Sequence, residues 1–270
     1  MKLPVTYLFV PGNRSERFDK AVASGADAVI LDLEDAVAPR DKDGARGSVL
    51  AWTNAHRDLA DRVVVRINDG TTPWFNADLA LLGQAGIRCA MLPKAEAAGQ
   101  IDAVRAALPP GGRVLPLIET ARGVDNVDAV AGAQGVTRLA FGTLDYAVDL
   151  DLSGDERGLV YPAARIAVAS RCAGLATPVA GVTSAIDDDQ QLLADLAFGR
   201  ALGFGAKLCI HPKQVAVIRK ALLPTAVEID WARRVVAAAE SGGGAVQVDG
   251  RMVDRPVLLK ARAILDRLPE

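Results

Sequence analysis

The sequence predicts an α/β protein, a (β/α)8 TIM barrel followed by a C-terminal helical and extended arm. Eight short apolar runs alternate with longer segments whose apolar residues recur at helical spacing. Half of the 270 residues are hydrophobic and only 4% are aromatic, so Ala, Val, Leu and Ile must fill the core, as in buried parallel strands covered by helices. The first apolar run leads into residues 10–14 without a G-x-G-x-x-G turn, which argues against a doubly wound open sheet.

The expected strands are the short apolar runs, at residues 7–10, 28–33, 62–67, 89–92, 114–118, 138–141, 178–182 and 207–210. Helical spacing between them is clearest at residues 15–24, 73–85, 101–108 and 187–202. Ser15 and the acidic residues at 187–189 are expected to cap the helices that follow them. Gly25, Gly86, Gly174 and Gly203 stand where helices are expected to end.

The chain continues beyond the eighth unit, so we expect two domains: a barrel at residues 1–225 and an arm at residues 226–270. The arm should contain a helix at 228–241, an extended or hairpin segment at 245–254 and a last helix at 256–268. A barrel does not need this appendage. It is either a lid or subunit-swapped arm, or an extension that closes the outside of the barrel.

Composition excludes several classes of protein. The 31 basic and 33 acidic residues nearly cancel and form no basic block, so we expect neither nucleic acid nor a membrane surface as a partner. Residues 1–10 lack the charged start and the long apolar stretch of a signal peptide, and no apolar run approaches the ~20 residues that span a bilayer. Cys89, Cys172 and Cys209 lie in apolar runs without metal-like spacing, which predicts reduced core thiols and a cytoplasmic protein.

The active site of such a barrel lies at the carboxyl ends of the strands, so the polar residues that follow each apolar run are the candidates. Five acidic residues and two basic residues converge there: Asp32, Glu34 and Asp35 after the second run, Arg66 after the third, Lys94 after the fourth, Glu119 after the fifth and Asp145 after the sixth. Gly142 and Thr143 lie between the sixth run and Asp145.

Crowded carboxylates repel one another unless a cation lies among them. Oxygen ligands without a Cys or His pair suit Mg²⁺ first and Mn²⁺ second, and Mg²⁺ commonly takes only one or two protein carboxylates. Glu119 and Asp145 fit that description, although such carboxylates can instead cap helices or pair with Arg and Lys. The same acidic surroundings should raise the pKa of Lys94, which argues against an amine nucleophile.

Six stretches of the sequence resemble the citrate lyase β-subunit-like family, within the HpcH/HpaI aldolase superfamily that includes malyl-CoA and citramalyl-CoA lyases. They are residues 8–14 (LFVPGNR), 28–37 (AVILDLEDAV), 65–68 (VRIN), 115–121 (LPLIETA), 139–146 (LAFGTLDY) and 209–212 (CIHP). The motifs occur in order over essentially the whole chain. The resemblance implies a (β/α)8 barrel that forms homotrimers or hexamers and uses Mg²⁺.

By this resemblance Glu119 and Asp145 are the metal carboxylates, and Arg66 grips the oxo acid. Asp32, Glu34 and Asp35 would lie around the metal waters, Glu34 would also be catalytic, and Lys94 would lie behind the metal ligands. Glu119, Gly142 and Thr143 would contact the substrate. Separately from the resemblance, we expect backbone amides around Gly142 to stabilise developing negative charge.

The tail also carries a resemblance. Residues 248–256 (VDGRMVDRP) look like the C-terminal segment of the CoA-thioester lyases, in which an aspartate matching Asp254 reaches over the active site of a neighbouring subunit. The alternative role of Asp254 is an N-cap two residues before Pro256, and the two roles are compatible. The family often has Arg-Ser where this chain has Val5-Thr6, and Arg14, Arg17 and Lys20 remain as nearby candidates for CoA phosphate contacts.

The expected function is therefore a Mg²⁺-dependent carbon–carbon lyase. Its substrate would be a 3-hydroxy-dicarboxylic acyl-CoA, such as malyl-CoA or citramalyl-CoA, which it cleaves reversibly to acetyl-CoA and a 2-oxo acid. Three alternatives stay open: a carrier-dependent citrate lyase β subunit that acts on a citryl thioester, a CoA-independent 2-oxo-acid aldolase, and a malyl-CoA thioesterase.

Overall fold

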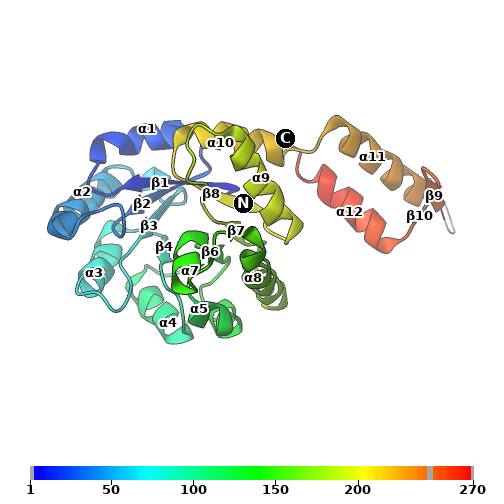
Figure 1. Ribbon diagram of the computed structural model, residues 1–270. Coiled ribbons are helices and arrows are strands. Elements are labelled where there is room, and N and C mark those ends of the chain that lie inside the picture. Colours follow the sequence, from blue (N-terminus) through cyan, green and yellow to red (C-terminus); the bar gives the residue numbers. More distant parts are fainter. Residues whose placement is uncertain (1–2, 242–245, 269–270) are drawn as a thin grey trace. The chain divides into compact units, whose positions relative to one another are not determined.

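A computed structural model of the chain describes residues 3–241 and 246–268. Eight parallel strands form a closed barrel in which β1 pairs with both β2 and β8 (Figure 1). The strands are β1 Thr6–Pro11, β2 Ala28–Asp32, β3 Val63–Arg66, β4 Cys89–Leu92, β5 Arg113–Ile118, β6 Ala140–Phe141, β7 Val179–Ala180 and β8 Ala206–Cys209. The predicted (β/α)8 barrel is confirmed, and every expected strand overlaps an observed one.

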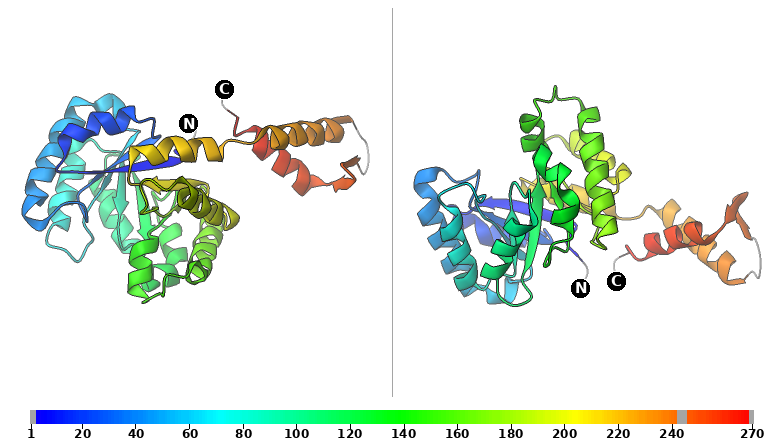
Figure 2. Two further views of the ribbon diagram at one scale, coloured as in Figure 1. Left: turned by 45° about the horizontal axis from the view of Figure 1, so that its top comes forward. Right: turned by 90° about the horizontal axis from the view of Figure 1, so that it is seen from below.

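Helices surround the barrel wall, as the views in Figures 1 and 2 show. They are α1 Phe18–Ala23, α2 Lys42–Ala55, α3 Phe75–Ala85, α4 Ala98–Ala107, α5 Ala121–Asp125, α6 Val127–Ala131, α7 Thr143–Asp149, α8 Val160–Cys172, α9 Asp189–Ala201 and α10 Pro212–Leu222. Short 3-10 helices lie at η1 Ser15–Arg17, η2 Pro39–Asp41, η3 Arg57–Leu59 and η4 Glu156–Leu159.

The interior of the barrel is filled by one apolar cluster, to which alternate residues of each strand contribute. In β8, Ala206 and Leu208 belong to this cluster, while Lys207 and Cys209 point to the outer layer. The interior is a packed core and not a channel, so function must reside at the strand ends.

Among the expected helix ends, the Asp cap of α9 and the glycine stop of α3 are confirmed and one N-cap is wrong. Asp188 caps α9 by accepting a hydrogen bond from the Gln191 amide at 2.9 Å. Gly86, which ends α3, has the left-handed φ of 62° that the expected glycine stop requires. The expected Ser15 cap is wrong, because Ser15 lies inside η1 and its N-cap position is Arg14.

The cysteine prediction holds for only part of the set. Cys209 is buried and Cys89 is half-buried, but Cys172 at the end of α8 is exposed. The apolar run around Cys172 belongs to a helix with one face in water, so its side chain need not enter the core. No helix in the part of the chain that the structure describes is long and apolar enough to cross a membrane.

The second compact unit begins within α10, at Arg219, earlier than the expected boundary at residue 226. It holds the helices α11 Ala226–Ser241 and α12 Arg255–Leu265 and the antiparallel hairpin β9 Val246–Val248 and β10 Arg251–Val253. Its small core is built from Ala232, Val235, Ala261 and Ile264. The helix–hairpin–helix order is as expected, and packing of this unit on a neighbouring subunit stays a prediction.

Arg138 ties together the amino ends of three strands, opposite the expected active site. Its buried guanidinium donates to the carbonyl oxygens of Thr177 and Pro4 at 2.5 Å each, and to the Tyr7 hydroxyl at 3.3 Å. Removing the guanidinium would leave these acceptors without a donor in a buried setting, which is costly.

We therefore expect Arg138→Met to lower the free energy of unfolding by about 2–4 kcal/mol, measured by urea denaturation. Arg165→Met is the matched control, because Arg165 forms an exposed ion pair with Asp128 at 2.7 Å and such pairs contribute at most ~1 kcal/mol. Equal stability of the two variants would contradict the role assigned to Arg138.

Candidate active site

Arg66, at the carboxyl end of β3, forms a bidentate ion pair with Asp32, at the carboxyl end of β2. Its Nε and Nη2 atoms donate to the two Asp32 carboxylate oxygens, both at 2.7 Å. Asp32 also accepts the backbone amides of Glu34 at 2.9 Å and Ala36 at 3.1 Å. Burial by itself would lower the pKa of Arg66, but the charge and hydrogen bonds of Asp32 outweigh it and raise that pKa above its usual value. Arg66 is thus a fixed cation.

Glu34 lies against the remaining nitrogen of this guanidinium. Its Oε2 atom is 2.8 Å from Arg66 Nη1, yet that buried oxygen accepts no hydrogen bond of good geometry. Burial raises the pKa of Glu34 to about 7, helped by Asp35 and Asp32 and opposed by Arg66. A carboxyl group with a pKa near neutrality can both accept and release a proton under physiological conditions.

Glu119, at the end of β5, is almost fully buried, with 2% of its surface exposed. Its Oε1 accepts the backbone amide of Lys94 at 2.9 Å. Burial raises the pKa of Glu119 to about 8, and the charges of Glu34 and Asp145 add to the effect. The charges of two carboxyl groups from other parts of the chain therefore act on Glu119, in line with the crowding of carboxylates that the sequence predicted.

Gly142 leaves room for the Glu119 side chain. A Cβ atom at position 142 would lie 2.4 Å from Glu119 Oε2, closer than any real contact. The Gly142 amide itself donates to the Ile118 carbonyl at 2.9 Å. Stabilisation of negative charge by the other backbone amides around Gly142 stays a prediction. The contribution of Gly142 that the structure supports is the absence of a side chain.

Lys94 follows β4 in a left-handed conformation, with φ of 46°, which is uncommon for a residue with a side chain. This conformation turns its amide to Glu119, and its Nζ lies 3.6 Å from Asp69 Oδ2. Burial would lower the pKa of Lys94, but Asp69, Glu34 and Glu119 raise it. The predicted direction is confirmed, and Lys94 is a cation and not a free amine nucleophile.

A buried polar network that sequence reasoning missed supports the second and third strand ends. Lys42 of α2 donates to the carbonyls of Leu33 at 2.7 Å and Glu34 at 2.8 Å and to Asn68 Oδ1 at 2.7 Å. Asp78 of α3, also buried, accepts both the amide and the side chain of Asn68. The ammonium therefore holds the backbone on either side of the Glu34 amide.

A signal for this network was available in the sequence. Lys42 is in register with Ala45 and Val49, and Asp78 with Leu81 and Leu82, on the inward face of each helix. A charged residue on the apolar face of a helix needs buried hydrogen-bonding partners. The positions of Lys42 and Asp78 on these faces therefore indicate a buried polar network.

The other expected residues are more exposed. Asp145 and Thr143 lie in the first turn of α7 beside Gly142, with Asp145 exposed. Asp35 is exposed and reaches Arg66 Nη1 only at 3.4 Å. Arg14, Arg17 and Lys20 are exposed, and Arg14 pairs with Glu16 at 2.6 Å.

Asp254 lies in the second unit. It caps α12 by accepting the Val257 amide at 3.0 Å, so the N-cap interpretation is confirmed and the catalytic one stays a prediction.

The donor set fits a hard cation that keeps most of its ligand positions for water or substrate. Within residues 3–241 and 246–268, no three His, Cys, Asp or Glu side chains are arranged to hold a metal by themselves. Glu119 and Asp145 offer oxygen ligands only, and two carboxylates with open positions are what Mg²⁺ commonly takes. The buried Glu34 Oε2 forms an ion pair with Arg66 but no well-formed hydrogen bond, so it can accept a further hydrogen bond, for example from a substrate hydroxyl.

Comparison with known proteins gives consistent results. A family model described as HpcH/HpaI aldolase/citrate lyase matches residues 6–212. A citrate lyase subunit beta-like protein of Mycobacterium tuberculosis is 39% identical over 98% of this chain and 95% of that protein. A (3S)-malyl-CoA thioesterase of Cereibacter sphaeroides is 35% identical over 96% of this chain and 92% of that protein.

A solved structure of CitE from M. tuberculosis, in complex with magnesium, acetoacetate and coenzyme A, aligns with a TM-score of 0.84 at 37% identity. The alignment covers 97% of both chains.

The raised pKa of Glu119 makes stability depend on pH when no metal is added. The unfolded chain releases this proton near pH 4.5, whereas the folded protein holds it until about pH 8. Because the folded state binds more protons in this window, the free energy of unfolding falls as pH rises through it.

Without divalent metal, we expect the melting temperature of the wild-type protein to drop by a few degrees between pH 6 and 8.5. The melting temperature of the Glu119→Gln variant should drop less. Glu16→Gln, at an exposed position, should behave as wild type; an identical decline in all three proteins would refute the assignment.

Proposed function

The chain belongs to the HpcH/HpaI aldolase/citrate lyase family, and from this membership and its site we propose a specific reaction. The enzyme is a Mg²⁺-dependent carbon–carbon lyase that cleaves a 3-hydroxy-dicarboxylic acyl-CoA, such as malyl-CoA or citramalyl-CoA, reversibly to acetyl-CoA and a 2-oxo acid. The observation that carries the proposal is the buried trio of Arg66, Glu34 and Glu119 at the strand ends.

Glu119 and Asp145 would hold Mg²⁺, with Mn²⁺ as a possible substitute. When bound, the ion supplies a Lewis acid that polarises the oxygen destined to become the carbonyl of the oxo acid. Two neighbouring carboxylates, one buried and one exposed, support this assignment. The solved structure of CitE in complex with magnesium supports the choice of the ion.

Arg66 binds the carboxylate of the oxo-acid half. Asp32 occupies Nε and Nη2. Nη1 lies 2.8 Å from Glu34 and donates to Asp35 at 3.4 Å, so a substrate oxygen that binds Nη1 would share it with these carboxylates. The ion pair with Asp32 fixes the plane of the guanidinium before substrate arrives, which saves the cost of orienting it.

Glu34 removes the proton of the substrate hydroxyl, and its pKa of about 7 suits a general base at neutral pH. The electron pair of the O–H bond forms the new carbonyl, the carbon–carbon bond breaks, and its electrons pass into the thioester as an enolate. Asp254 of a neighbouring subunit in a homotrimer or hexamer, or a water near Glu34, then protonates the enolate carbon to give acetyl-CoA. Arg14, Arg17 and Lys20 are the proposed contacts of the CoA phosphates.

A malyl-CoA thioesterase is the second candidate, favoured by the 35% identity to a protein of that name. Two assays separate the reactions. A lyase produces an oxo acid, detected as its phenylhydrazone, without a free thiol. A thioesterase produces free CoA thiol, detected with a disulfide reagent, without an oxo acid. Purified enzyme with malyl-CoA, citramalyl-CoA and Mg²⁺ should give the first pattern.

The same assays decide the remaining alternatives. A carrier-dependent citrate lyase β subunit would leave both free CoA thioesters unchanged. A CoA-independent aldolase would cleave free 4-hydroxy-2-oxo acids without inhibition by added coenzyme A. Either outcome would overturn the proposed substrate class.

The metal carboxylates can be tested by isosteric change. Glu119→Gln and Asp145→Asn should each lower kcat/KM by at least ~100-fold, because each removes an anionic ligand, and each should weaken Mg²⁺ binding measured by calorimetry. Asp128→Asn, at an exposed carboxylate paired with Arg165, is the matched control and should keep full activity. Undiminished wild-type turnover in excess EDTA would refute metal dependence.

The arm can be tested by mixing two inactive proteins. If Asp254 acts across a subunit interface, Asp254→Ala and Arg66→Ala subunits should each be inactive alone and should regain part of the activity after co-assembly, because some sites then combine both intact residues. Mixing either variant with itself is the control. Failure of a verified mixed oligomer to gain activity would place Asp254 within its own subunit or outside catalysis.

A further inference from the structure

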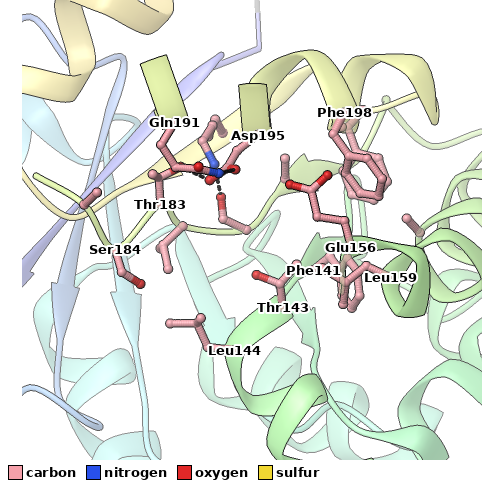
Figure 3. Close-up of a pocket in the computed structure, with 18 residues that line it drawn as sticks. Phe141, Thr143, Leu144, Glu156, Leu159, Thr183, Ser184, Gln191, Asp195 and Phe198 are labelled. Carbon is pink, nitrogen blue, oxygen red and sulfur yellow. Dashed lines mark hydrogen bonds between the residues drawn. The ribbon is translucent and has the colours of Figure 1, made fainter. Parts of the chain in front are cut away.

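A cavity lies beside the site described above, against the outer side of the barrel wall, and shares Thr143 with the residues expected to contact the substrate. It encloses about 410 Å³, which falls within the range of small-molecule pockets. Residues of β6, β7 and β8 form its floor, and residues of α8 and α9 and of the segments after β6 and β7 form its sides (Figure 3). None of the metal carboxylates lines it.

Most of the lining is apolar. Phe141, Leu159, Ala163, Phe198 and Phe204 are among the residues that surround the space. In Figure 3 Phe198, Phe141 and Leu159 lie on one side of the cavity, whereas Thr183, Gln191 and Asp195 lie together on another. The cavity thus has an apolar side and a polar side, as expected for a ligand with an apolar body and a polar head.

Lys207 is the cation of this cavity. It lies in the middle of β8 with its side chain directed away from the barrel core, and only 1% of its surface is exposed. Its Nζ donates to the Gly181 carbonyl at 2.6 Å. An ammonium group has three N–H donors, so Lys207 can accommodate further acceptors.

No carboxylate neutralises Lys207 at close range. Among the described residues, no carboxylate oxygen lies within 4.0 Å of Lys207 Nζ in an ion pair. Burial lowers its pKa to about 8, with Asp195 opposing the shift, so the ammonium form prevails at neutral pH. A buried charge without a close counter-ion is costly, and a ligand that brings an anionic oxygen would relieve that cost.

Neither acidic residue of the lining, Asp195 or Glu156, is a close counter-ion for Lys207. Asp195 already accepts hydrogen bonds from the Thr183 hydroxyl and, at 2.6 Å, from the Gln191 amide. Glu156 is exposed, so water screens its charge. The buried and incompletely partnered group is the lysine.

We propose that this cavity binds a small carboxylate with an apolar body, whose carboxylate pairs with Lys207 and whose chain lies against Phe141, Leu159 and Phe198. This cavity adjoins the proposed lyase site at Thr143 but is not lined by Arg66, Glu34 or either proposed metal carboxylate, and the proposal does not depend on the identity of the acyl-CoA. A straight aliphatic chain of roughly four to eight carbons suits a cavity of this size, and each buried methylene should tighten binding by about fourfold.

Straight-chain carboxylates serve as probes, with binding followed by calorimetry on the wild-type protein. Hexanoate should bind saturably and more tightly than butanoate, while hexylamine and hexanol should bind at least about tenfold more weakly because neither carries an anion. Lys207→Met should weaken hexanoate binding at least about tenfold. Lys213→Met is the matched control, since Lys213 is exposed and paired with Asp187, and it should bind hexanoate as wild type does.

A second measurement avoids substitutions at Lys207. Hexanoate should protect Lys207 from acetylation in the wild-type protein, read by mass spectrometry of its peptides, and should leave the acetylation of Lys213 unchanged. Ala163→Leu, which fills the cavity from α8, should also abolish binding in protein whose melting shows that it is folded. Absence of saturable hexanoate binding, equal binding of hexylamine, or unchanged binding by folded Lys207→Met protein would each overturn the proposal.

Discussion

The ion pair between Arg66 and Asp32 is the interaction on which the rest of the site depends. It joins the ends of two neighbouring strands, and both partners are almost fully buried. Asp32 uses its remaining capacity to hold the amides of Glu34 and Ala36, so one carboxylate sets both the guanidinium and the turn that carries Glu34. A buried pair of this kind adds little net stability but fixes geometry, because breaking either half leaves an uncompensated charge.

A second constraint is the crowding of carboxyl groups beside that pair. Glu34 and Glu119 have raised pKa values because burial and mutual repulsion disfavour their charged forms. Backbone features accommodate this crowding: Gly142 has no side chain to obstruct Glu119, and Lys94 takes a left-handed conformation that turns its amide to the same carboxylate. Backbone strain and repulsion between like charges are typical of functional sites, where a bound ligand offsets the unfavourable charge.

The polar groups that the chain buries fall into two kinds. Lys42 has three acceptors at hydrogen-bonding distance and Asp78 is bonded to Asn68 and Arg46, so this network is complete and serves as a rigid support. Lys207 and Glu34 are buried but incompletely satisfied: Lys207 has one acceptor among the described residues and lines a cavity, and Glu34 Oε2 has no well-formed hydrogen bond. The distinction between satisfied and unsatisfied buried charge therefore separates scaffold from candidate binding groups.

The sequence by itself determined the barrel, its eight strands and the face on which Arg66, Glu34 and Glu119 meet. Strand periodicity and the rule that strand ends share one face are local and topological properties that residue order carries. Only the tertiary structure decided how these groups pair. Asp32 takes two nitrogens of Arg66, the Gly142 amide is used by Ile118, and Lys42 and Asp78 enter the core beneath the site. Hydrogen-bond partners depend on distances of a few tenths of an ångström between segments far apart in the chain, and no pattern along the sequence encodes those distances.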